Sequence, residues 1–88
     1  MKTITIPQEE NGISFSSALT GCWLKDPSFN RRVSQFVSAT RLRKLLENAA
    51  AGSAASVLDE DWQALKGVVE ADKNPNRIVL GKAVLDAK

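Results

Sequence analysis

The strongest constraint on the fold is an amphipathic helical pattern that begins near Asp59. Its apolar stripe consists of Leu58, Trp62, Leu65 and Val69, which stand at i, i+4, i+7 and i+11. Asp59 stands where a carboxylate can accept a hydrogen bond from a free backbone N–H, and Glu60 and Asp61 lie where the helix dipole favours negative charge. We therefore expect a helix that is capped by Asp59 and that packs Trp62 into a core.

The 88 residues include 43% hydrophobic and 25% charged side chains, which is ordinary for a globular protein. We expect one domain over residues 1–88, with a core so small that self-association is a favourable way to bury more surface. The single cysteine, Cys22, allows no internal disulfide and is expected to be buried beside Trp23. No apolar run is long enough to cross a membrane, and residues 1–4 lack the apolar segment of a signal peptide, so we expect a cytoplasmic protein.

Alternating polar and apolar residues predict two strands near the N-terminus. The first covers residues 2–6 and stops at Pro7, and the alternation resumes at residues 13–15 after the Asn11-Gly12 turn signal. We therefore expect an antiparallel hairpin over residues 1–15. Residues 16–24 place apolar side chains at helical intervals and predict a short helix.

The segment from Asp26 to Ala50 contains a helical pattern that changes phase. Asp26-Pro27 is a cap followed by a proline at the first helical position. One side of the pattern carries Phe29, Val33, Phe36, Val37 and Thr40, and nearly the opposite side carries Leu42, Leu45, Leu46 and Ala49. Either the helix is broken around residues 38–40, or one continuous helix over residues 27–50 buries two faces against two partners.

The second alternative leaves an apolar face for another subunit. The candidate residues for a protein interface are therefore Phe29, Val33, Phe36, Val37 and Trp23. Trp23 is included because a tryptophan exposed at an edge would anchor an interface, although the core is its default place.

Turn and cap signals organise the rest of the chain. Residues 49–56 are small and turn-rich and predict a connecting segment with Gly52 as a helix C-cap. Asn74-Pro75 precedes residues 77–85, which fit a terminal helix or a strand beginning at residue 78, and the start signal favours the helix. The expected fold class is α+β and mainly helical, with the hairpin at residues 1–15 and three or four short helices in residues 16–88.

The sequence contains no recognisable catalytic constellation. It has no histidine, so its serines lack the commonest activating base and the commonest metal ligand is missing. Glu60 and Asp61 would point about 100° apart on a helix and would not share one proton or one metal ion. We therefore expect a non-enzymatic protein with no catalytic residue, no metal and no cofactor.

Five basic residues gather between positions 31 and 44. They are Arg31, Arg32, Arg41, Arg43 and Lys44. Such clusters can contact nucleic-acid phosphates, but a helix spreads these five around its axis, and we expect no aromatic stacking platform among them. A solvated helix face is the favoured interpretation, and a nucleic-acid site is the alternative.

The C-terminal half resembles small accessory proteins of bacteriophages and prophages. The resemblance lies in the order of Arg41–Leu46, a small-residue loop, Leu58–Lys66, Val68-Val69, Pro75 and Val79–Ala83. It implies a phage or prophage origin and a role in virion assembly, in the host cytoplasm or on the virion. It carries over no catalytic residue. The favoured function is protein binding, either to a second copy or to a phage structural protein. The alternative is a small nucleic-acid-binding or host-modulating phage protein that uses the basic cluster.

Overall fold

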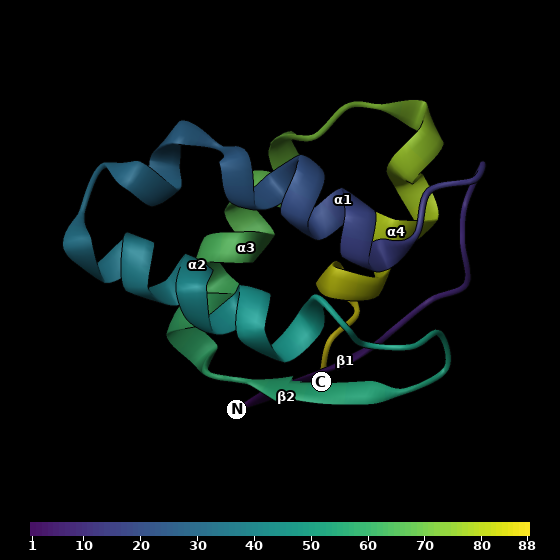
Figure 1. The fold of residues 1–88 in the computed structure, drawn as a ribbon, viewed down its shortest axis with the longest axis horizontal. Coiled ribbons are helices and arrows are strands. Elements are labelled where there is room, and N and C mark those ends of the chain that lie inside the picture. Colours follow the sequence, from purple (N-terminus) through teal and green to yellow (C-terminus); the bar gives the residue numbers. More distant parts are fainter.

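The computed structural model covers all 88 residues and contains four α-helices on one side of a two-stranded antiparallel sheet (Figure 1). In chain order the elements are β1 (Lys2–Thr5), α1 (Phe15–Gly21), the 3-10 helices η1 (Trp23–Lys25) and η2 (Pro27–Asn30), α2 (Val33–Leu46), β2 (Ala54–Val57), α3 (Asp59–Ala71), the 3-10 helix η3 (Pro75–Arg77) and α4 (Ile78–Leu85). The small, mainly helical α+β class expected from the sequence is confirmed.

The strand β1 pairs with the middle of the chain and not with residues 13–15. Its register places Lys2 opposite Val57 and Thr5 opposite Ala54. The predicted Asn11-Gly12 turn does form, with positive φ at both residues and a single bridge between Glu10 and Ile13. The expected second strand is replaced by α1, because the Ser14 side chain accepts a hydrogen bond from the Ser17 N–H and caps a helix that begins at Phe15.

The segment predicted as a connection, residues 49–56, contributes most of β2. Gly52 is not a helix C-cap, because α2 has already ended at Leu46. It occupies a turn with a φ of 87°, from which its N–H donates to the Ile6 carbonyl at 2.8 Å. This turn brings β2 alongside β1.

The helix α2 is continuous through residues 38–40, and the interruption lies earlier, at Arg31-Arg32. Asp26 caps η2 by accepting from the Ser28 N–H, and Arg32 then adopts an extended conformation before α2 begins. The interruption separates Phe29, which is buried from η2, from the other residues of its predicted face. Val33, Phe36 and Val37 remain on α2, where they are exposed while Leu42 and Leu46 are buried.

A single cluster of 17 buried hydrophobic residues forms the core. The predicted α3 stripe is confirmed for Trp62, Leu65 and Val69, and the Trp62 indole N–H donates to the Val84 carbonyl at 2.8 Å. Cys22 is exposed rather than buried, because the adjacent Trp23 takes the core position at the end of α1. No helix has the length and apolar character needed to cross a bilayer.

The start of α3 differs from the prediction. Leu58 is the N-cap residue, and Asp59 is the first residue within the helix, so it makes no capping hydrogen bond. Its carboxylate lies 3.1 Å from the N-terminal amine of Met1, which β1 brings to this end of α3.

Residues 78–85 form the predicted terminal helix α4, preceded by η3 with Asn74 as its cap. The Glu10 carboxylate accepts hydrogen bonds from the N–H groups of Val79 and Leu80, at 2.8 and 3.1 Å. Residues far apart in the sequence therefore fix the N-terminal loop against the first turn of α4.

Candidate functional site

The first turns of α2 present three neighbouring apolar side chains to solvent. Val33, Phe36 and Val37 are 81%, 58% and 40% exposed. They stand at i, i+3 and i+4, so they share one side of the helix, while Leu42 and Leu46 bury the other side. We call Val33, Phe36 and Val37 the α2 surface.

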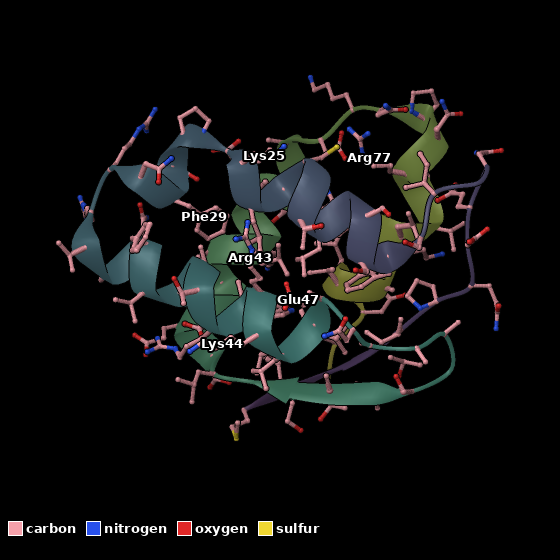
Figure 2. All side chains as sticks on the ribbon, viewed as in Figure 1. Lys25, Phe29, Arg43, Lys44, Glu47 and Arg77 are labelled. Atoms are coloured by element: carbon pink, nitrogen blue, oxygen red, sulfur yellow. The ribbon has the colours of Figure 1, made fainter.

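A hollow of about 230 Å³ adjoins the α2 surface between η2 and α2. Its lining consists of Leu24, Phe29, Asn30, Phe36, Ala39, Thr40 and Arg43. Leu24 and Phe29 are buried and supply an apolar floor, whereas Phe36 and Arg43 are exposed. In Figure 2, Phe29 lies in the space between η2 and α2, with Arg43 on the α2 side. We call this depression the α2 hollow.

Four cations lie near the α2 surface in the chain, and one of them, Arg43, also lines the α2 hollow. Arg31 and Arg32 directly precede α2, and Arg43 and Lys44 follow Val33 at i+10 and i+11, on the same side of the helix. All four are exposed, and none belongs to an ion pair. We call Arg31, Arg32, Arg43 and Lys44 the basic rim.

Two carboxylates lie close to the basic rim in sequence. The pKa of Asp26 is lowered, mainly because it accepts the Ser28 N–H and to a smaller extent because of the charge on Arg31. Glu47 follows Arg43 by one turn at the end of α2 and is exposed. The basic rim therefore keeps an excess of positive charge.

Arg41, the fifth member of the predicted basic cluster, has a structural role instead. Its guanidinium donates to both oxygens of Asp61 at 2.8 Å and to Glu60 at 3.2 Å, which ties α2 to the first turn of α3. Burial raises the pKa of Asp61, but hydrogen bonds from Arg41 and Ser38 outweigh this, and the net direction is downward. The sequence predicts for Asp61 only a favourable charge at the helix start. It contains no signal that singles out Arg41, because Arg41 and Arg43 both flank the buried Leu42.

The structure thus brings together parts of both predicted sites. Val33, Phe36 and Val37 form an exposed interface candidate, and four of the five predicted basic residues precede or follow it along the chain and are also exposed. Trp23 is not an interface residue, because it is 1% exposed and its indole N–H donates to Asp72 at 2.9 Å. Phe29 contributes only as the floor of the α2 hollow. Phe36 provides an aromatic side chain among the cations, contrary to expectation.

A second depression, of about 420 Å³, lies between α3 and α4. Two of its lining residues, Asp72 and Arg77, are joined by hydrogen bonds of 2.8 and 2.9 Å. The Arg77 guanidinium is the main reason that the pKa of Asp72 lies well below its usual range. Because these charges satisfy each other, they are not available to a ligand.

No group of three or more histidine, cysteine, aspartate or glutamate residues is placed so that it could hold a metal ion. No known family, curated protein or solved structure matches this chain.

Proposed function

We propose that this chain is a non-enzymatic protein-binding accessory protein that acts in phage virion assembly and binds its partner through the α2 surface. The observation that carries the proposal is the exposure of Val33, Phe36 and Val37 side by side. Full burial of a large apolar side chain contributes about 1.5–3 kcal/mol, and a small domain has few such side chains to leave in water. Neighbouring exposed apolar residues of this kind are typical of a surface that another protein covers.

The assembly role is supported by the resemblance of the C-terminal half to phage accessory proteins. In this proposal the protein acts in the host cytoplasm or on the particle, and its partner is a phage structural protein or a second copy. The resemblance covers Arg41–Leu46 of α2, and the α2 surface lies in the preceding turns of the same helix.

The pairing of the buried Asp61 and the half-buried Asp72 supports a non-enzymatic role. Asp61 is occupied by Arg41, and Asp72 by Arg77 and Trp23. These are structural contacts between helices, in which each carboxylate is held ionised by its partners, and they leave no buried acid poised to transfer a proton.

The proposal can be tested by site-specific photo-crosslinking in the bacterium that carries the gene. A photo-crosslinking amino acid replaces Val33 in one strain and the exposed Thr5 of β1 in a control strain. We expect position 33, but not position 5, to form adducts with a virion protein or with a second copy, identified by mass spectrometry. An absence of protein adducts at position 33, or the same adducts from both positions, would contradict the proposal.

A further inference from the structure

We infer that the partner is an acidic segment of another protein, which inserts one large apolar side chain into the α2 hollow and places carboxylates against the basic rim. This inference rests on the proposed protein-binding function and specifies the chemistry of the partner.

The size of the α2 hollow favours a single side chain as its occupant. Sites for cofactors and other small molecules usually enclose about 300–1,000 Å³. The α2 hollow, at about 230 Å³, is smaller. Its floor of Leu24 and Phe29 offers apolar contact, and Phe36 stands at its edge. Protein interfaces commonly contain this arrangement, in which one apolar anchor fills a pocket and dominates the binding energy.

The charges near the α2 surface favour an acidic partner. Arg31, Arg32, Arg43 and Lys44 carry four positive charges without ion pairs. The carboxylates of Asp26, which interacts with the charge on Arg31, and of Glu47, one turn after Arg43, offset part of this charge, and the basic rim keeps a net positive charge. Carboxylates on a partner would find arginine donors that no residue of this chain uses, and the positive field would speed their encounter.

The same charges oppose a second copy as the occupant. If two α2 surfaces faced each other, the basic rim of one copy would meet the basic rim of the other. Like charges brought together across an interface cost several kcal/mol. This repulsion would offset the free energy gained by burying the three apolar side chains of each copy. An acidic partner gains free energy from both apolar burial and charge attraction.

The apolar residues favour a protein over a single-stranded nucleic acid. Proteins that bind single strands stack successive bases on several aromatic side chains. The α2 surface has one exposed aromatic residue, Phe36, and its other members, Val33 and Val37, have no π-face. Val33 and Val37 instead offer apolar contact to the aliphatic side chains of a peptide.

The test is a selection of short random peptides, displayed on yeast, for binding to the full chain. The Phe36→Ser variant serves for counter-selection. We expect the enriched peptides to contain one large apolar residue flanked by aspartate and glutamate. In fluorescence anisotropy titrations, F36S and Arg43→Gln should each weaken binding of an enriched peptide by roughly tenfold or more, and added salt should weaken it further. The matched control is Val79→Ser, which removes a similarly exposed aliphatic residue on α4 and should leave the affinity unchanged.

Four results would overturn the inference. In the selection, these are a failure to enrich any peptide or the enrichment of neutral or basic peptides. In the titrations, they are an equal loss of affinity in V79S, or oligothymidylate that binds more tightly than the peptides and loses this binding in F36S. The inference would also be wrong if sedimentation equilibrium showed a dimer that F36S dissociates. The partner would then be a second copy and not an acidic segment. In that case position 33 would crosslink to the chain itself, and the proposed protein-binding function would stand without this partner.

Discussion

At the scale of single residues, Asp61 shows how strongly packing changes the role of a side chain. It is fully buried at the start of α3, where Arg41 donates to both of its oxygens. A buried carboxylate without its partner is costly, so the pair is required for α2 and α3 to dock as they do.

Replacing Asp61 with asparagine should lower the free energy of unfolding by about 2–4 kcal/mol, because the charge-assisted hydrogen bonds are lost while Arg41 stays hydrated. Urea denaturation at neutral pH measures this loss. The matched control, Asp59→Asn, changes an exposed carboxylate in the same helical turn and should cost less than about 1 kcal/mol. Similar losses in both variants would contradict the assignment.

Asp72 is expected to make stability depend on pH in the acid range. The pKa of Asp72 is lowered from 3.8 in the folded state, chiefly by Arg77, so folding favours its charged form. Its contribution is therefore present above about pH 4 and is lost as the pH falls toward the folded-state pKa. Urea midpoints measured between about pH 5 and pH 2 should fall more steeply for the wild type than for Asp72→Asn. Parallel curves would show that this pair does not drive acid unfolding.

At the scale of elements, the sequence predicted those parts whose signals are local. Trp62, Leu65 and Val69 of the α3 stripe are buried as predicted, although Leu58 is exposed. Asp26-Pro27 and Asn74-Pro75 each start a short 3-10 helix, and the Asn11-Gly12 turn forms. The strand β2 could not be found in this way, because Ala54-Ala55-Ser56 has no apolar alternation and becomes a strand only by pairing with β1.

The candidate site was predicted only in part, because its local patterns can be read from the sequence but its long-range contacts cannot. Val33, Phe36 and Val37 were identified as an apolar face, and the basic residues were identified as a cluster. That Arg41 leaves this cluster for Asp61 depends on how α2 packs on α3, across 20 residues of sequence. The exposure of Phe36 depends on which of the two apolar sides of α2 packs on the core, and the sequence pattern alone does not decide between them.

The packing of α4 on α3 can be tested with two glycines. Gly67, in α3, has open space around its Cα, so Gly67→Ala should stabilise the protein by about 0.5–1 kcal/mol through helix propensity. Gly81, in α4, is buried, and a Cβ there would lie 3.0 Å from Cγ1 of Val69. In Gly81→Ala the close contact with Val69 should therefore outweigh the gain in helix propensity and destabilise the protein by about 1–3 kcal/mol. Thermal melts of the two variants measure the contrast, and equal stabilisation would show that α3 and α4 are not in close contact.

At the scale of the whole molecule, β1 joins both halves of the chain. It pairs with β2 along one edge, and on the other edge Thr3 exchanges backbone hydrogen bonds of 3.1 and 3.2 Å with Lys88. The two ends of the chain therefore meet at the sheet, as Figure 1 shows. Ile4 and Ile6 project from this N-terminal segment into the core. An independent N-terminal hairpin could be lost without unfolding the helices. The strand β1 cannot, because its partners lie in distant parts of the chain.

Ile4→Ala should accordingly destabilise the entire protein by about 2–5 kcal/mol, because it leaves a cavity where β1 meets the common core. Far-UV circular dichroism reports the helices, and tryptophan fluorescence reports Trp23 and Trp62, so both signals should shift to the same lower urea midpoint. The matched control is Thr5→Ala on the exposed side of the same strand, which should cost less than about 1 kcal/mol. If the helical signal kept its wild-type midpoint in I4A while fluorescence changed, the helices would fold without β1. The strand would then be an appendage of the helical part rather than the element that closes its core.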